Sequence, residues 1–184
     1  MKNSRLLLLA LSIIFCISCK DEPIPKPKAK IRLEYPQGNL AELQADNFSF
    51  QYNQLANPES NAENAFTIAY PDMNGAIFLS YKKVDGDLDK LIYDAKRLSY
   101  EHAAKADNIV EQPYVNPKEK VYGALFEVQG DAASQSQFYV TDSTEHFLTG
   151  SVYFYAKPNY DSILPAAAYL QNDIRGIIET LKWK

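Results

Sequence analysis

A chain of 184 residues is long enough for one domain with an ordinary hydrophobic core. Its formal net charge is −4 and its basic residues form no long run, which argues against nucleic acid as a partner because phosphates require clustered Lys and Arg. Both cysteines, Cys16 and Cys19, lie near the start. The rest of the chain therefore holds no disulfide, thiolate metal site or cysteine nucleophile.

The first 19 residues have the layout of an export signal. Lys2 and Arg5 precede an apolar run, and Ser18 is the small residue before Cys19. The run is too short to span a bilayer, which requires about 20 apolar residues. We predict a bacterial lipoprotein signal peptide over residues 1–18, cleaved before Cys19, with the lipid attached to the Cys19 sulfur. Cleavage removes 18 of the 184 residues and two basic ones, leaving 166 residues with a net charge of −6.

Residues 19–30 form a predicted spacer between the lipid and the domain. This segment contains three prolines and shows no apolar periodicity. A chain of this composition is semi-extended and reaches roughly 35 Å, at about 3.1 Å per residue. Its lysines either contact anionic lipid headgroups or remain solvated. Residues 31–184 are predicted to form a single domain that reaches the membrane through the lipid anchor.

Strands and one helix are predicted in the first half of this domain. Apolar Phe48, Phe50 and Tyr52 alternate with polar residues, as in a strand with one buried face. Residues 65–70 and 75–81 are predicted as two more strands, joined by a turn. Residues 53–64 are polar and are predicted to form a loop. Apolar side chains then recur at helical spacing, which predicts a helix from Leu88 to Ala106 with a buried stripe of Leu88, Leu91, Ile92, Ala95, Leu98, His102 and Ala106.

The second half of the domain is predicted to be a strand meander followed by a helix. The four strands are expected at 109–115, 121–129, 135–141 and 146–156, with tight turns at 116–118 and 142–144. The last of them is long and aromatic, which indicates a central position in the sheet.

The closing helix is predicted from about Asp161 to Leu181. Asp161 or Ser162 is the expected cap, Pro165 is expected in the first turn, and the apolar stripe runs from Leu164 to Leu181. This element order predicts an α+β fold, in which an antiparallel sheet is flanked by two main helices.

No residue pattern indicates catalysis. His102 lies on the apolar stripe of the first helix and is interpreted as a structural residue, whereas His146 opens a strand. The chain has no Gly-x-Ser-x-Gly elbow and no glycine-rich phosphate loop. The alternating Asp85, Asp87 and Asp89 lack the later glycine and glutamate of a calcium-binding EF-hand, so they are interpreted as a turn and helix cap. We therefore predict no enzyme, no metal site and no cofactor.

The chain resembles a known family over nearly all of its exported part. The run from Tyr114 to Ser162 and the final IETLKWK are similar to the gliding-motility lipoprotein family GldD of Bacteroidetes, and PKPKAKIRLEYP, FLSYK and LIYDAKRLSYEHAAKAD match it in the same order. The resemblance implies a membrane-anchored, non-enzymatic component of the gliding motility and type IX protein secretion apparatus. Its implied partners are other envelope proteins of that apparatus. The element order also looks similar to the Mog1/PsbP-like fold.

A candidate partner-binding site lies within the matched stretch. Residues 130–134 are small and polar and are predicted at a sheet edge, where they either serve turn geometry or accept a partner strand. The candidate residues, predicted on one side, are Asp131, Ser134, Gln137, Asp142, Ser143 and His146. The alternative function is an extracytoplasmic small-ligand or glycan-binding lipoprotein with tyrosines as stacking platforms. An enzyme would require a carboxylate pair in a cleft.

The predicted location is the cell envelope, at the outer membrane. Asp21 and Glu22 directly follow Cys19 and Lys20, which resembles a surface-export signal of Bacteroidetes lipoproteins. The periplasmic and the surface face of the membrane both remain open.

Overall fold

The computed structural model describes residues 33–62, 64–101, 105–156 and 159–184. Residues 31–184 form one compact unit. The predicted signal peptide, Cys19 and the spacer lie outside the described residues. None of the helices in the described part of the chain is long and apolar enough to cross a membrane.

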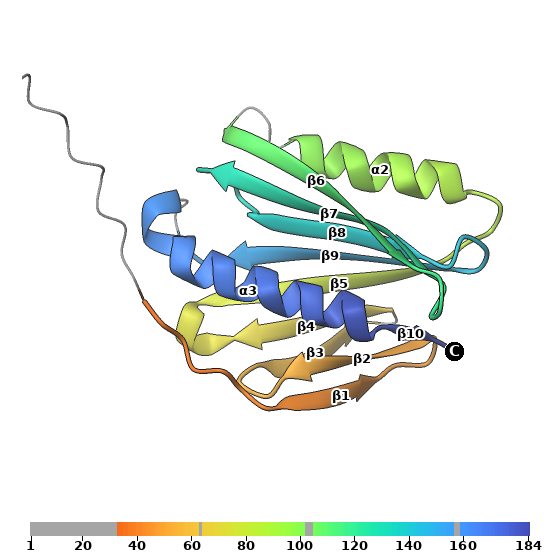
Figure 1. Cartoon of the computed structure of the whole chain (residues 1–184), viewed down its shortest axis with the longest axis horizontal. Helices are drawn as coiled ribbons and strands as arrows, with labels where there is room; N and C mark the ends of the chain where they lie inside the picture. Colours follow the sequence, from red (N-terminus) through yellow and green to blue (C-terminus); the bar gives the residue numbers. More distant parts are fainter. Residues whose placement is uncertain (1–32, 63, 102–104, 157–158) are drawn as a thin grey trace, which may run out of the picture. The chain divides into compact units, whose positions relative to one another are not determined.

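The described residues form an α+β fold of antiparallel sheets with two long helices (Figure 1). The elements are β1 (Leu40–Gln44), β2 (Phe48–Asn53), β3 (Asn57–Ala62), β4 (Ala65–Tyr70), η1 (Pro71–Met73), β5 (Gly75–Lys83), α2 (Leu88–Tyr100), β6 (Ala106–Asn116), β7 (Val121–Gly130), β8 (Ser136–Thr141), β9 (His146–Phe154), α3 (Tyr160–Thr180) and β10 (Lys182–Trp183).

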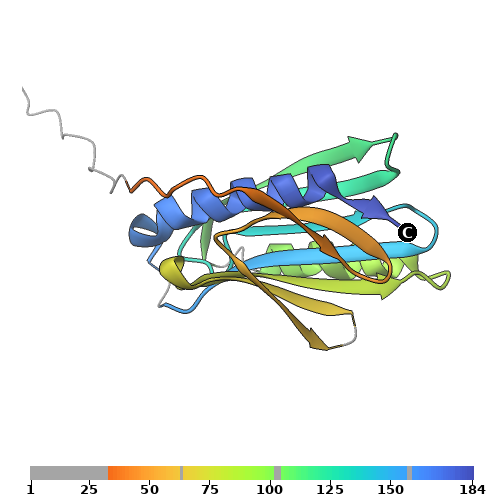
Figure 2. The same cartoon turned by 90° about the horizontal axis from the view of Figure 1, so that it is seen from below.

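The strands make two sheets. The larger sheet has seven strands in the order β3-β4-β5-β9-β8-β7-β6, and the smaller has the order β1-β2-β10. Helix α3 and the smaller sheet pack on one side of the larger sheet, here called the inner face. Helix α2 lies on the other side, the outer face (Figure 2).

The main hydrophobic core fills the space between the inner face, α3 and the smaller sheet. Leu170 and Ile174 of α3 pack there with Phe48 and Phe50 of β2, and all four are almost fully buried. A second cluster lies under α2, where Leu91 packs with Phe126, Tyr139 and Phe147 from the outer face. Apolar residues on both sides of one sheet explain why β8 is buried along its whole length.

Most of the predicted strands are confirmed. The structure has strands at all three predicted positions of the first half and at all four of the meander, and β9 is the central strand of the seven. The predicted loop over 53–64 is wrong, because Asn57–Ala62 forms β3. This strand lies at the sheet edge and pairs with β4 alone. Its polar residues and Pro58 suit an edge position, where the backbone pairing forms without a buried face.

Both predicted helices are present, but their predicted ends and caps are wrong. Helix α2 ends at Tyr100, and Ala106 belongs to β6, while His102 lies outside the described residues. Helix α3 begins at Tyr160, and Asn159 occupies the N-cap position without a side-chain cap bond. The predicted caps Asp161 and Ser162 both lie inside the helix, as does Pro165, which falls beyond the first turn.

Candidate functional site

The candidate site is a groove on the outer face, beside α2. The strand register forms two neighbouring rows of side chains across β5, β9 and β8: Phe78, Ser151 and Gln137 in the first row, and Ser80, Thr149 and Tyr139 in the second. Helix α2 covers the end of the rows at Gln137 and Tyr139, which are buried. The end at Phe78 and Ser80 is exposed. Helix α2 therefore covers the part of the outer face at β8 and leaves the side chains of Phe78 and Ser80 on β5 exposed.

Two adjoining hollows make up the groove. Their volumes are about 330 Å³ and about 560 Å³, which is the size of typical ligand clefts. Phe78, Leu98, Gln137 and Ser151 line both hollows. Leu98 extends from α2 as the wall, and Ser151 lies on the floor.

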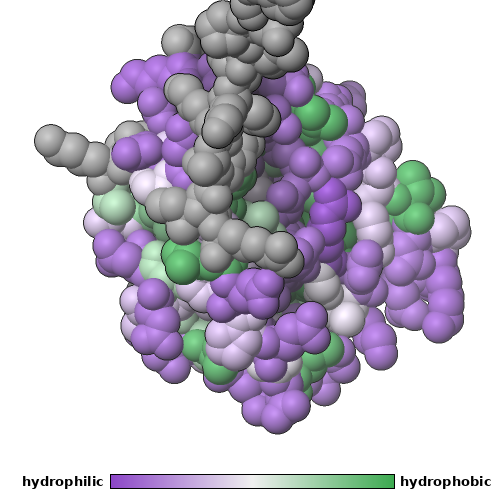
Figure 3. All heavy atoms as spheres, turned by 60° about the vertical axis from the view of Figure 1, so that its left-hand side comes forward, coloured by the Kyte–Doolittle hydropathy of each residue, from purple (hydrophilic) through white to green (hydrophobic). Residues whose placement is uncertain are grey.

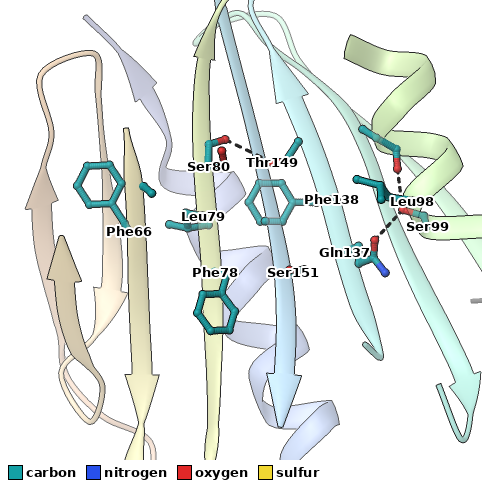
Figure 4. Close-up of a pocket in the computed structure, with 13 residues that line it drawn as sticks. Phe66, Phe78, Leu79, Ser80, Leu98, Ser99, Gln137, Phe138, Thr149 and Ser151 are labelled. Carbon is teal, nitrogen blue, oxygen red and sulfur yellow. Dashed lines mark hydrogen bonds between the residues drawn. The ribbon is translucent and has the colours of Figure 1, made fainter. Parts of the chain in front are cut away.

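Two hydroxyl groups of the wall and floor, those of Ser99 and Thr149, donate hydrogen bonds within the groove. The Ser99 hydroxyl lies 3.1 Å from Oε1 of Gln137 and 3.2 Å from the carbonyl oxygen of Ala95. The Thr149 hydroxyl donates to the carbonyl oxygen of Ser80 at 3.3 Å (Figure 4). These bonds satisfy buried polar groups and fix the position of α2 over the sheet.

Gly150 allows the strand under the groove to lie close to the core. A Cβ at this position would clash with the Phe138 ring and would lie 2.8 Å from Cδ2 of Leu79. Phe138 therefore fills the space beneath β9 that a side chain at position 150 would need (Figure 4). The groove floor is rigid because the core directly below it is filled.

A strip of exposed aromatic rings extends the groove along β9. The ring centroids of Phe78 and Tyr153 are 6.2 Å apart, and those of Tyr153 and Tyr155 are 5.4 Å apart. Phe78 is 36% exposed, Tyr153 43% and Leu98 54%. Figure 3 shows one end of the molecule, where hydrophobic residues form small groups among hydrophilic ones. Apolar side chains gathered along a groove differ from such scattered residues and are typical of interaction sites.

One charged residue, Glu101, lines the groove within the described part of the chain. Its Oε1 lies 4.0 Å from Nε of Arg97, and the side chains of both residues are more than half exposed. Arg97 also lies 3.5 Å from Asp94. The pairing of Glu101 is therefore long and shared, and the groove ends in a carboxylate that is only weakly neutralised.

Helix α2 is fastened on the side away from the groove. Lys96 Nζ donates to Oε1 of Glu111 on β6 at 2.7 Å, and the Tyr100 hydroxyl donates to Oε2 of the same carboxylate at 3.0 Å. The hydrogen bond with Lys96 lowers the pKa of the Glu111 carboxyl, and the same bond raises the pKa of Lys96. These contacts hold the helix over β6 and leave its Leu98 side facing the groove.

Comparison with protein families identifies the family of this chain. The model of the gliding motility lipoprotein GldD family matches residues 20–183. The chain belongs to the GldD family. No curated protein matches it. Membership makes the chain a lipoprotein of the cell envelope, anchored at a membrane and associated with gliding motility.

In this GldD-family lipoprotein the six predicted partner-binding residues do not lie together. Asp131 and Ser134 precede β8, whereas Asp142, Ser143 and His146 follow it, so the two groups lie at opposite ends of that strand. Only Gln137 and Ser134 line the groove, and both are buried. The predicted sheet edge is wrong, because β7 and β8 are paired on both sides and the edges of the seven-stranded sheet are β3 and β6.

Asp131 has a structural contact. Its Oδ1 accepts a hydrogen bond of 2.8 Å from the backbone N–H of Tyr160, the first residue of α3. Asp131, from the loop between β7 and β8, thus accepts a hydrogen bond from the first turn of α3, whereas the side chain of the N-cap residue Asn159 makes no such bond. Gly130, just before it, has φ of +110°, a conformation that L side chains rarely adopt. Turn geometry accounts for this segment.

The turn after β8 is held together by Asp142. Its Oδ1 accepts hydrogen bonds from the backbone N–H groups of Thr144, Glu145 and His146, while Ser143 takes a φ of +71°. Burial raises the pKa of the Asp142 carboxyl, but the Thr144 hydroxyl and these three N–H groups outweigh it and lower the pKa to about 2. The predicted tight turn is confirmed.

His146 belongs to an aromatic cluster beside this turn. Its Nδ1 lies 2.9 Å from the Tyr81 hydroxyl, and its ring stacks on Trp183 with centroids 5.2 Å apart. Trp183 donates from Nε1 to the carbonyl oxygen of Lys120 at 3.1 Å. The cluster fastens the end of the chain to the seven-stranded sheet.

The residues that shape the groove were missed by sequence reasoning. Leu98 was expected on the buried stripe of its helix, and this is wrong, because Ser99 is buried there instead. The available signal was Phe78, which falls between the inward Ile77 and Leu79 and must therefore point to the other face. A large aromatic residue at an outward position indicates a covered or functional outer face.

No group of three or more histidine, cysteine, aspartate or glutamate residues that could hold a metal ion occurs within residues 33–62, 64–101, 105–156 and 159–184. Asp85 and Asp87 belong to the turn before α2, where Oδ1 of Asp87 accepts a hydrogen bond of 3.1 Å from the backbone N–H of Asp85. This agrees with the turn interpretation. Asp87 also occupies the N-cap position of α2, but its side chain makes no cap bond there.

Proposed function

We propose that this GldD-family lipoprotein is a non-enzymatic scaffold or assembly component of the gliding motility and type IX protein secretion apparatus, and that it acts through protein contacts. The observation that carries the proposal is the groove beside α2, with exposed Phe78, Leu98 and Tyr153 along a rigid floor. Clustered aromatic and aliphatic side chains are typical of protein interfaces. Family membership supports the link to gliding motility.

The chemistry of the groove favours contact over catalysis. Its Ser99, Gln137 and Thr149 side chains are hydrogen-bonded to one another or to the backbone. A nucleophile requires a base within reach and a third group that orients the base. The groove residues offer serine and threonine hydroxyls beside leucine and phenylalanine, which is a surface suited to recognition.

The anchor is part of the proposal. We expect Cys19 to carry the lipid, such as palmitate, and residues 19–30 to hold the domain away from the outer membrane of a Bacteroidetes cell. We also propose that the α+β domain is Mog1/PsbP-like, a fold that occurs in extracytoplasmic binding and assembly proteins. In cells that produce Cys19→Ser, the protein should leave the membrane pellet, and its retention there would contradict the lipid anchor.

A small-ligand or glycan-binding function is the second candidate. It is favoured by the neighbouring rings of Phe78, Tyr153 and Tyr155, because exposed aromatic faces serve as stacking platforms. The aliphatic Leu98 opposite them and the internally paired polar groups fit a protein partner better.

Filling the groove tests the proposed function. Ser151→Phe places a ring on the floor of both hollows, and we expect the cells to lose colony spreading and secretion while the protein stays at its normal level. Val115→Phe is the control, since Val115 is an exposed residue on β6, away from the groove. Normal spreading and secretion with Ser151→Phe would overturn the proposal.

A further inference from the structure

We infer that the groove binds an extended segment of a partner protein that carries a basic side chain next to an apolar one. The apolar side chain lies between Phe78 and Leu98, and the basic side chain lies at Glu101 beside Tyr153. This inference rests on the proposed function and names the chemistry of the partner.

The carboxylate of Glu101 is the reason for expecting a basic side chain in the bound segment. Glu101 lines the second hollow together with Tyr153 and Phe78, and its contact with Arg97 is long at 4.0 Å. A cation placed there lies close to a carboxylate and to two aromatic rings, and both kinds of group can attract it. An acidic segment would be repelled by the same carboxylate, so electrostatic complementarity selects a basic partner.

The apolar residues on the two sides of the groove are the reason for expecting an apolar side chain in the bound segment. Phe78 on β5 and Leu98 on α2 line both hollows and are partly exposed. An aliphatic or aromatic side chain inserted between them would remove both from water, which is the main favourable contribution at an interface. The groove spans Thr149 to Tyr153 along β9, roughly 13 Å at about 3.3 Å per residue, which is the length of four to five extended residues.

Other occupants fit less well. A lipid acyl chain would place hydrocarbon against the Glu101 carboxylate, which is unfavourable. A glycan needs many hydrogen-bonding groups along the groove, but Ser99 donates to Oε1 of Gln137 and Thr149 donates to the backbone of Ser80. The Ser80 and Ser151 hydroxyls and Nε2 of Gln137 are left for a sugar, beside the apolar Phe78 and Leu98. A peptide segment can place an apolar side chain against the aliphatic wall and a basic side chain at the carboxylate.

Site-specific photo-crosslinking in cells tests the inference on the full-length lipoprotein. A benzophenone amino acid replaces Leu98 in one strain and Phe78 in a second, and Val115, exposed on β6 away from the groove, is the control position. After irradiation the adduct is digested and the crosslinked peptide is sequenced by mass spectrometry. We expect a protein adduct from both groove positions and not from Val115, with Lys or Arg within three residues of the crosslinked apolar residue.

The charge requirement is tested in the same strains. Glu101→Lys should lower the adduct yield about fivefold, whereas Glu101→Asp should largely preserve it. If the peptide lacks a basic residue or the yield is unchanged by Glu101→Lys, the inference is wrong and the proposed function stands. If neither groove position gives a protein adduct, or if the adduct is a lipid or a glycan, both are wrong.

Discussion

The two faces of the seven-stranded sheet are formed by the same strands, but other parts of the chain cover them to different extents. On the inner face, Ile77, Leu148 and Val152 are fully buried beneath α3 and the smaller sheet. On the outer face, α2 buries Phe126 and Tyr139, but Phe78, two strands away from Tyr139, remains partly exposed. One face is closed by the chain itself, and the other is closed over half its width.

This difference separates stability from recognition. Buried apolar area provides most of the folding free energy, and it is concentrated on the inner face. The open half of the outer face contributes little to folding, so its residues can be selected for contacts with another molecule. A sheet buried on one side can carry a binding surface on the other without loss of stability.

A substitution in the core should show most clearly that the inner face contributes more to the free energy of unfolding than the open half of the outer face does. Leu170 of α3 is fully buried on the inner side. Leu170→Ala should lower the free energy of unfolding by about 2 to 5 kcal/mol, because it removes apolar contacts and leaves a cavity. The measurement is urea denaturation of the purified protein.

Leu98→Ala is the matched control for this substitution. Leu98 is the same residue type on the outer side and is more than half exposed, so its replacement should change the free energy of unfolding by about 0.5 kcal/mol or less. Equal destabilisation by both substitutions would show that the groove wall supports the fold as much as the core does.

A smaller effect is expected at the polar network that joins the inner layers. Tyr70 and Asn53 donate hydrogen bonds of 2.7 Å and 3.1 Å to Oδ2 of Asp173 on α3. Burial raises the pKa of the Asp173 carboxyl, and these two bonds lower it only in part. Burial, together with the charge of Asp173, also raises the pKa of Tyr70. A carboxylate is therefore held in a position that favours its neutral form.

Asp173→Asn should stabilise the protein in a pH-dependent manner. The folded protein favours protonated Asp173, so the contribution of this group is present below the unfolded pKa of about 3.9 and is lost as the pH rises through the folded value. One amide oxygen can accept both bonds now made to Oδ2. The melting temperature of Asp173→Asn should exceed that of the wild type at pH 8, and the difference should shrink at pH 4. A difference that grows toward pH 4 would contradict this sign.

The sequence predicts the inner face better than the open half of the outer face. Alternating residues in β2, β4 and β5 and the apolar stripe of α3 indicate burial directly, because each pattern lies within one element. The strand β3 was missed because its residues carry no apolar alternation, and its pairing is supplied by β4. The short β10 and the three-stranded sheet likewise depend on contacts between the two ends of the domain.

The groove could not be predicted because its residues are far apart in the sequence. Phe78, Leu98, Gln137 and Ser151 come together only through the register of β5, β9 and β8 and the placement of α2. The predicted site followed neighbours along the chain around 131–146 and therefore found two turns at opposite ends of β8. Local pattern indicates which face a residue takes, whereas strand order determines which residues meet.

Cysteine labelling tests most directly whether the open half of the outer face is covered by a partner in the cell. Ser80→Cys introduces a thiol in the groove, and Ser60→Cys introduces one at an exposed position on β3. The background is low because the described residues contain no cysteine. Labelling rates with a small maleimide are compared between isolated cell envelopes and the purified protein.

We expect Ser80→Cys to be labelled at least about tenfold more slowly in envelopes than in the purified protein, and Ser60→Cys to be labelled equally in both. Equal labelling of Ser80→Cys in the two preparations would contradict the central claim that this groove is a protein contact surface.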